Sequence, residues 1–205
     1  MNKIIQENFN FEIISIQKLN GYENENYLIQ TNINKFIFKK YPYSTDLESI
    51  IHGENQALLF LSENNNKYPS PVKTVDGVYV KVLEINNEMF ICRMLSFIEG
   101  EMLGNIKNTK KIFQSFGIFL AKMNLRLQPY KNSVIESRRW NWDLQYFHLN
   151  KKYINDLPTK NDKILVKYFF NQFEKNVNPV IPLLRKSIIH SDANEWNVLV
   201  LNGKV

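Results

Sequence analysis

Alternation of apolar and polar positions in the first 95 residues predicts a sheet of short strands. Strand-like runs rich in β-branched and aromatic residues occupy 11–18, 27–31, 35–39, 78–83 and 89–95. The segment 46–62 instead repeats apolar residues at helical spacing, so we expect one helix after the third strand. Asp76-Gly77 precedes one of the last two strands and Asn86-Asn87 connects them, as is typical of hairpins. The pattern therefore predicts an antiparallel sheet with one inserted helix.

The rest of the chain follows a helical period. Apolar positions repeat on one face of 112–127, with Thr109 as the expected N-cap, and again along 160–177. Pro179 and Pro182 end the second helix before the segment that leads to residue 190. The change of pattern falls near 93–100. We therefore expect an α+β chain with a small lobe at 1–95 and a mainly helical large lobe at 96–205.

Composition narrows the class of protein. The chain has 205 residues, of which 44% are hydrophobic, as in an ordinary globular protein. No apolar run reaches about 18 residues, and the N-terminal segment holds acids and amides, so we expect neither a membrane span nor a signal peptide. A single cysteine, Cys92, allows no intrachain disulfide and favours a cytoplasmic location.

The net charge of +6 does not by itself indicate a nucleic-acid partner. Only 5 of the 26 basic residues are Arg, and the abundance of Lys and Asn is typical of AT-rich coding. A nucleic-acid module would be expected to carry a clustered basic helix or an exposed aromatic ladder. The sequence shows neither feature, so we expect no nucleic acid among the partners.

The strongest candidate for chemistry is a polar loop between two apolar runs near residue 190. There His190, Asp192 and Asn197 have the spacing H-x-D-x-x-x-x-N. In kinases with this spacing the Asp accepts the proton of the substrate hydroxyl and the Asn binds Mg²⁺. We expect Asp192 as the catalytic residue, Asn197 as a metal ligand and His190 as a brace for the loop. The alternative is a structural loop whose Asn and Asp only cap turns.

A second candidate pairs a strand with the inserted helix. Lys39 ends the third apolar run, where kinases place a Lys that holds the nucleotide phosphates. Glu54 lies among the apolar positions of the helix at 46–62, and a carboxylate there needs a partner. We expect Lys39 and Glu54 to act together. Lys40 and Glu48 are the alternatives, and a solvated surface position remains open for all four.

Two weaker candidates surround the expected nucleotide. The turn 20–26 carries Gly21 and Asn24, whose backbone amides could face phosphate, although a plain hairpin turn explains them equally well. Met94 and Ser96 lie where the two lobes join and would offer backbone groups to the base. Trp140 and Trp142 are more typical of core anchors than of ligands.

Several segments together resemble one family. The segment I-I-H-S-D-A-N-E-W-N-V-L-V resembles the catalytic loop of aminoglycoside phosphotransferase-like kinases. With the preceding L-L-R-K-S, it is most similar to the hydroxylysine kinase branch. Three more segments agree with this resemblance: N-Y-L-I-Q-T followed by K-F-I-F-K, G-E-N-Q-A-L-L-F-L, and R-M-L-S-F-I-E-G-E-M-L ahead of R-R-W-N-W-D-L. The resemblance therefore runs along nearly the whole chain.

The resemblance implies a protein-kinase-like bilobal fold and a phosphotransferase reaction. The γ-phosphate of GTP or ATP, bound with Mg²⁺, would pass to a hydroxyl of a small amino alcohol or amino acid. For the named branch the implied acceptor is hydroxylysine, while ethanolamine, homoserine and aminoglycosides stay open. By matching position, Lys39 and Glu54 would form an ion pair, Asp192 would be the base and Asn197 a Mg²⁺ ligand.

The resemblance also implies a departure at the C-terminal end. Family members continue into an I-D-F-G-D-like segment whose first Asp binds Mg²⁺, whereas this sequence ends at Val205. We therefore expect an incomplete large lobe, residues that are nearly inactive alone and a complementing C-terminal segment as a partner. The alternative function is an inactive nucleotide-binding fragment or remnant.

Overall fold

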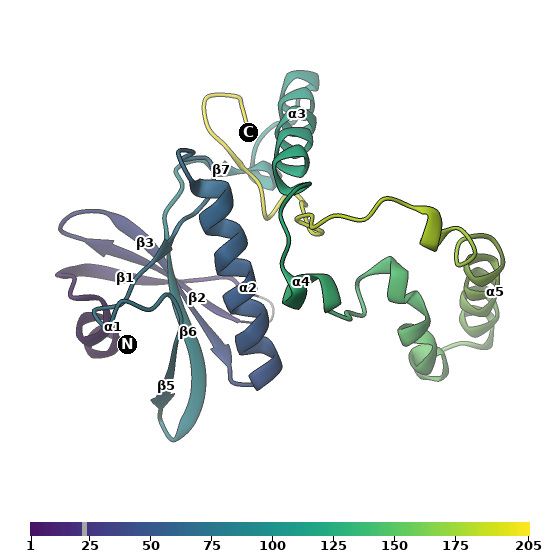
Figure 1. Cartoon of the computed structure of the whole chain (residues 1–205), viewed down its shortest axis with the longest axis horizontal. Coiled ribbons are helices and arrows are strands. Elements are labelled where there is room, and N and C mark those ends of the chain that lie inside the picture. Colours follow the sequence, from purple (N-terminus) through teal and green to yellow (C-terminus); the bar gives the residue numbers. More distant parts are fainter. Residues whose placement is uncertain (22–23) are drawn as a thin grey trace.

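An antiparallel sheet lies beside a group of helices in the computed structural model, which describes residues 1–21 and 24–205 (Figure 1). The strands of this sheet are β1 (Ile13–Leu19), β2 (Glu25–Thr31), β3 (Lys35–Pro42), β4 (Pro71–Val72), β5 (Lys81–Ile85) and β6 (Glu88–Ser96). Their spatial order is β1-β2-β3-β6-β4, with β5 also paired to β6. These pairings are antiparallel. The predicted α+β class is confirmed.

The helices are more numerous than the sequence pattern predicted. They comprise α1 (Asn2–Phe9), α2 (Thr45–Ser62), α3 (Lys110–Leu127), α4 (Ser133–Ser137) and α5 (Lys160–Asn176), with 3₁₀ segments η1 (Leu103–Asn105), η2 (Leu144–Asp156) and η3 (Ile181–Leu183). A second, two-stranded sheet joins β7 (Glu101–Met102) to β8 (Leu199–Val200). Among the described residues, no helix is long and apolar enough to cross a membrane.

Side-chain caps explain where two of the predicted helices begin. The hydroxyl of Ser44 accepts a hydrogen bond from the backbone N–H of Leu47 at 3.2 Å and starts α2. Thr109 does the same for Ile112 at 3.3 Å and starts α3, which confirms the predicted N-cap. The acidic residue Glu48 lies in the first turn of α2, where a negative charge favours the helix dipole.

Three sequence expectations about these elements were wrong. The strand predicted at 78–83 begins only at Lys81, because the N–H of Thr74 donates to the carbonyl of Val78 at 2.8 Å and closes a turn. Helix α1 was not predicted, since its polar residues hide the helical spacing of Ile5 and Phe9. The face predicted along 112–127 is less buried than expected, and Phe113 is 54% exposed.

The two faces of the sheet carry different helices. On one face the fully buried Ile29 and Phe38 pack with Ile5 and Phe9 of α1. On the other face Ile51 of α2 packs with Ile91 and its neighbours. Because successive side chains of a strand point to opposite faces, alternate positions of β3 and β6 face α1 and α2.

A third core joins the sheet side of the molecule to the helical side. Leu61 of α2 packs with Met123 and Leu127 of α3, and with Ile188 shortly before the polar loop. The guanidinium of Arg126 adds hydrogen bonds to the carbonyls of Phe60 and Glu63 at the end of α2. The polar loop is thus held close to α2. The division into lobes at residues 95 and 96 stays a prediction.

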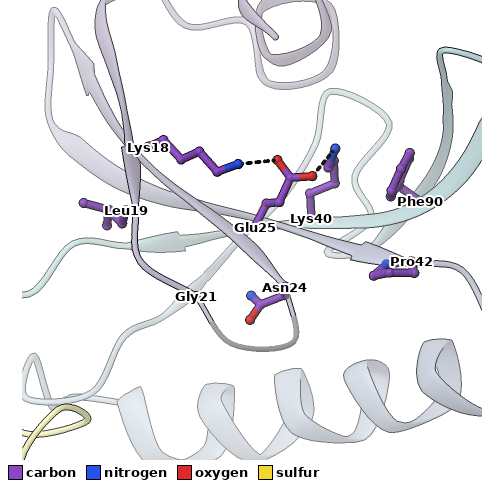
Figure 2. A pocket seen from close by; sticks show the side chains of 8 residues that line it. All are labelled: Lys18, Leu19, Gly21, Asn24, Glu25, Lys40, Pro42 and Phe90. Atoms are coloured by element: carbon purple, nitrogen blue, oxygen red, sulfur yellow. Dashed lines mark ion pairs between the residues drawn. The ribbon is translucent and has the colours of Figure 1, made fainter.

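One charged cluster lies on the α1 face of the sheet. Glu25 is paired with the ammonium of Lys40 at 2.6 Å and with that of Lys18 at 3.4 Å, and it also accepts a hydrogen bond from the hydroxyl of Tyr27. Figure 2 shows both lysines converging on Glu25. Lys40 lies 4.1 Å from the centre of the Phe90 ring. The hydrogen bonds from Lys40 and Tyr27 lower the pKa of Glu25 to about 2, against a smaller opposing effect of burial.

We predict that Ile29→Ala lowers the free energy of unfolding by about 2–5 kcal/mol, because its side chain is fully buried. Ile14→Ala on the adjacent strand is the matched control. Ile14 is 66% exposed, so the change should stay within about 0.5 kcal/mol. Urea unfolding followed by circular dichroism measures both. Equal losses in the two variants would contradict the assigned core.

A second prediction concerns acid stability. The pKa of Glu25 is about 2 in the folded chain, below its ordinary 4.5, so its stabilisation is present above pH 4.5 and is lost as the pH falls toward 2. Lys40→Met should lower the free energy of unfolding at pH 7. It should also reduce the further loss of that free energy between pH 7 and pH 3.

Lys18→Met is the control for the acid experiment. The side chain of Lys18 is 65% exposed, so its contribution is screened by solvent and the variant should keep the wild-type profile. Urea unfolding at pH 7 and pH 3 makes the comparison. A Lys18→Met profile as flat as that of Lys40→Met would count against the pair.

Candidate functional site

The register of β3 against β6 places Lys39 directly opposite Arg93. Opposed residues of an antiparallel pair project on the same face of the sheet. Arg93 contacts Glu54 and Asn55, so this is the face that α2 covers. Lys39, predicted to bind phosphate, and Glu54, predicted as its partner, are therefore brought to one region by the sheet and the inserted helix.

Arg93 occupies the centre of this region. It is 5% exposed, and its guanidinium donates to Glu54 Oε2 at 2.9 Å, to Asn55 Oδ1 at 2.9 Å and to the hydroxyl of Tyr41 at 2.8 Å. The planar fork of an Arg can satisfy several acceptors at once, which a buried cation needs. Arg93 was not among the site residues predicted from the sequence. A lone cation in the otherwise apolar run of β6 was the available signal.

The expected ion pair between Lys39 and Glu54 is not formed in the described part of the chain. There Glu54 pairs with Arg93 at 2.9 Å and with Arg138, which follows α4, at 3.7 Å. The physical reason is that the enclosed guanidinium of Arg93 takes the carboxylate and two further acceptors together. This contact corrects the implied ion pair between Lys39 and Glu54. The role of both residues in nucleotide binding stays a prediction.

Lys39 is half-buried beside these charges. Burial, together with repulsion from Arg93, lowers the pKa of its ammonium to about 8, and the attraction of Glu54 offsets only part of this effect. Within residues 1–21 and 24–205, its ammonium takes part in no ion pair shorter than 4.0 Å. An anion reaching Lys39 would favour its charged form.

The polar loop holds the carboxylate of Asp192 by side-chain amides. Asn197 Nδ2 donates to Asp192 Oδ2 at 2.8 Å and to the carbonyl of Asp192 at 2.9 Å. Asn194 Nδ2 donates to Asp192 Oδ1 at 2.8 Å. Asp192 itself is exposed, so a carboxylate of fixed orientation faces solvent at the loop.

His190 contacts the same loop from its N-terminal side. Its Nδ1 accepts a hydrogen bond from the backbone N–H of Asp192 at 3.3 Å, which agrees with the expected bracing role. Desolvation by the surrounding protein lowers the pKa of the His190 imidazole, while the negative charges of Asp192 and Glu54 oppose this shift. Glu54 therefore acts on the loop electrostatically from α2.

The strands that flank the loop differ from the expectation. The run before His190 is not a strand, and Ile189 is 53% exposed. The run after the loop contributes only the two residues of β8, which pair with β7. The N–H of Gly104 also donates to the carbonyl of Glu195 at 3.0 Å, and a Cβ on Gly104 would come within 2.9 Å of the Trp196 ring. The loop is therefore fastened to the segment 101–105.

The two residues predicted to contact the nucleotide base have other contacts. Met94 is fully buried on the α1 face and lies between β3 and β4. The N–H of Ser96 donates to the carbonyl of Ser70 at 2.8 Å, and its hydroxyl accepts from the N–H of Ser70 at 2.8 Å. The role of Met94 and Ser96 in binding a base stays a prediction.

The turn predicted to cover phosphates is described only in part, because residues 22 and 23 lie outside the described residues. Gly21 and Asn24 line a pocket of about 300 Å³ together with Lys18, Glu25 and Lys40 (Figure 2). Glu25 and Lys40 are cross-strand partners on the α1 face, whereas Lys39 lies on the α2 face. This pocket is thus separate from Lys39.

The donor atoms at the loop suit a hard cation. Asp192 and Asn197 carry carboxylate and amide oxygens, and Mg²⁺ commonly binds one or two such groups together with water and substrate phosphates. Over the described ranges, no group of three or more His, Cys, Asp or Glu is placed to hold a metal without other ligands. The residues present therefore fit a Mg²⁺ site that needs substrate to complete it.

Comparison with known proteins agrees with this arrangement. The model of the family described as "Phosphotransferase enzyme family" matches residues 15–205. Hydroxylysine kinase of Danio rerio is 22% identical over 194 residues, covering 90% of this chain and 55% of the relative. Hydroxylysine kinase of Mus musculus is 21% identical over 213 residues, covering 96% and 57%. The chain spans a little over half the length of these relatives.

Two solved structures share the fold. An amicoumacin kinase, in complex with AMP-PNP, Ca²⁺ and Ami, superposes with a TM-score of 0.73 at 17% identity, covering 99% of this chain and 60% of the other. A spectinomycin phosphotransferase, in complex with ADP and spectinomycin, gives 0.60 at 15% identity, covering 98% and 64%. The match along residues 15–205, with the kinase-like fold and the Asp192 loop, shows that the chain belongs to the phosphotransferase enzyme family.

Proposed function

We propose that this chain takes part in transferring the γ-phosphate of ATP or GTP to a hydroxyl of a small amino-bearing metabolite. The observation that carries the proposal is the fixed carboxylate of Asp192 in a loop near α2. Helix α2 covers the face of the sheet on which Lys39 lies. We propose hydroxylysine as the acceptor, because the relatives from Danio rerio and Mus musculus are hydroxylysine kinases. The activity of the whole protein is part of this proposal.

Asp192 would orient the acceptor hydroxyl and accept its proton as the new O–P bond forms. A base must lie within hydrogen-bond reach of the proton it removes, and the amides of Asn194 and Asn197 hold the carboxylate in one orientation for this task. An acceptor that carries an ammonium group would also find the negative charge of Asp192 favourable. As this bond forms, the bond between the γ-phosphorus and the oxygen that bridges it to the β-phosphate breaks, and the nucleoside diphosphate leaves.

Lys39 would bind the phosphate groups of the nucleotide. Lys39 is half-buried and lies on the face of the sheet that α2 covers. Asn197 would hold Mg²⁺, which supplies charge neutralisation for phosphate oxygens when it is bound. Gly21 and Asn24 line the pocket on the α1 face, but their turn leads directly to Asn26, which lies opposite Lys39, so the turn would approach the phosphates from the edge of the sheet. Backbone groups near Met94 and Ser96 would approach the base. The cell compartment that suits these substrates is the cytoplasm.

A second candidate function is nucleotide binding without turnover, in the chain alone or with a complementing C-terminal segment. Its support is that the residues described by the structure provide no cluster of three His, Cys, Asp or Glu side chains that could hold a metal. A metal-assisted reaction is more demanding than binding, because charge must be stabilised as the phosphate moves. Both candidates predict that nucleotide binds at Lys39.

We predict that the chain binds ATP or GTP with Mg²⁺ and that Lys39→Met weakens this binding by about tenfold or more, since a charge-assisted contact is lost. Lys40→Met is the matched control, because Lys40 lies on the opposite face and is held by Glu25. Calorimetric titration measures both. Binding that Lys39→Met leaves intact would overturn the proposed site.

Turnover is tested by transfer of radiolabelled γ-phosphate to hydroxylysine. Asp192→Asn should lower the rate by about 10²–10⁴-fold without loss of nucleotide binding, and the exposed Asp156→Asn should have no effect. Ethanolamine, homoserine and an aminoglycoside serve as competing acceptors. Binding without transfer in the wild type would favour the second candidate over catalysis.

A further inference from the structure

The proposed reaction assigns no task to Arg93, although Arg93 is the most enclosed cation beside Lys39. It lies opposite Lys39 across the β3–β6 pair and is 5% exposed. Every hydrogen bond of its guanidinium in the structure goes to Tyr41, Glu54 or Asn55. Its position therefore determines which charges Lys39 meets.

Among the described residues, Glu54 is the carboxylate whose charge acts on Lys39. Two cations compete for it from the sheet, Lys39 and Arg93, and a third, Arg138, reaches it from the helical side at 3.7 Å. Arg93 holds the carboxylate at 2.9 Å and also binds Asn55, which is 2% exposed and itself donates to the carbonyl of Tyr79 at 3.4 Å. These neutral contacts fix the guanidinium in place, and an ammonium at Lys39 could not reproduce them.

The consequence, within residues 1–21 and 24–205, is that the ammonium of Lys39 forms no ion pair with a carboxylate. The groups that face it are Arg93 from β6, Glu54 from α2, and the neutral Asn26 opposite it on β2. Beyond Glu54 lie Arg138 after α4, and His190 and Asp192 in the loop. Among these described groups the cations are in excess, and an incoming anion meets the charges of Lys39 and Arg93, of which Arg93 is already paired with Glu54.

We propose that Arg93 is a positioning residue that captures the carboxylate of Glu54 and so keeps Lys39 available for an anionic ligand such as a nucleotide phosphate. The inference deepens the proposed function and rests on it for the identity of the ligand. Whether Glu54 pairs with Arg93 or with Lys39 is a property of the chain without ligand, so it can be measured in the absence of nucleotide.

The test follows the titration of Lys39 directly. The lysines are reductively methylated with ¹³C-formaldehyde, and Lys39→Arg identifies the resonance of Lys39. In the wild type the pKa of Lys39 should be near 8, below its ordinary 10.5. In Arg93→Met, Glu54 is released to Lys39, and this pKa should rise by about one pH unit or more.

A double variant separates release of Glu54 from simple loss of a repelling charge. If Glu54 moves to Lys39, adding Glu54→Gln to Arg93→Met should reverse most of the rise, whereas Glu54→Gln in the wild type should change the pKa of Lys39 little. Arg126→Met is the matched control. It removes an arginine that joins α3 to the end of α2 through backbone carbonyls and has no contact with Glu54, so the titration of Lys39 should not change.

Three results would overturn the inference. One is a wild-type pKa of Lys39 at or above 10.5, which means that Glu54 already pairs with Lys39. Another is an equal effect of Glu54→Gln with and without Arg93. If Arg93→Met does not fold, as judged by circular dichroism, a large fall of the Lys39 pKa in Glu54→Gln alone is the third. Failure of the kinase proposal would appear separately, as a chain that titrates as expected but binds no nucleotide.

Discussion

The antiparallel register of β3 and β6 is the constraint on which the site depends. It sets Lys39 against Arg93 on the α2 face and Lys40 against Cys92 on the α1 face. Because side chains alternate, a slip of one residue would exchange these faces and bury the wrong lysine under α2. The fully buried Phe38 and Met94, one position away on each strand, hold the register through the α1 core.

The polar loop depends on a second set of long-range contacts. β8 pairs with β7, and Ile188 packs into the core shared by α2 and α3, so the loop is fixed at both of its ends. Glu54 then contributes to both halves, since it pairs with Arg93 of the sheet and Arg138 of the helical side. A site assembled in this way is sensitive to the position of α2.

Much of the fold was predictable from the sequence because its elements have regular periods and ordinary caps. The spacing of His190, Asp192 and Asn197 likewise identified a loop in which the side chains of His190 and Asn197 both contact Asp192. The helix α1 and the strand β7 were missed, since α1 is rich in polar residues and β7 has only two residues. Local patterns carry little signal for such elements.

The partner of Glu54 could not be predicted for a different reason. Sequence showed that a carboxylate on a half-buried helix needs a cation, but the choice between Lys39 and Arg93 depends on which of them can also satisfy Tyr41 and Asn55. That choice is geometric. The solvent exposure of Phe113 shows the same limit, because an apolar stripe predicts a face that can be buried without showing what covers it.

The most direct test of the account is a crystal structure of the chain with Mg²⁺ and a non-hydrolysable nucleoside triphosphate. We expect the phosphates to contact Lys39 on the α2 face, the metal to lie at Asn197, and Glu54 to stay with Arg93. A nucleotide bound instead in the pocket beside Lys18 and Lys40, with Lys39 paired to Glu54, would contradict it.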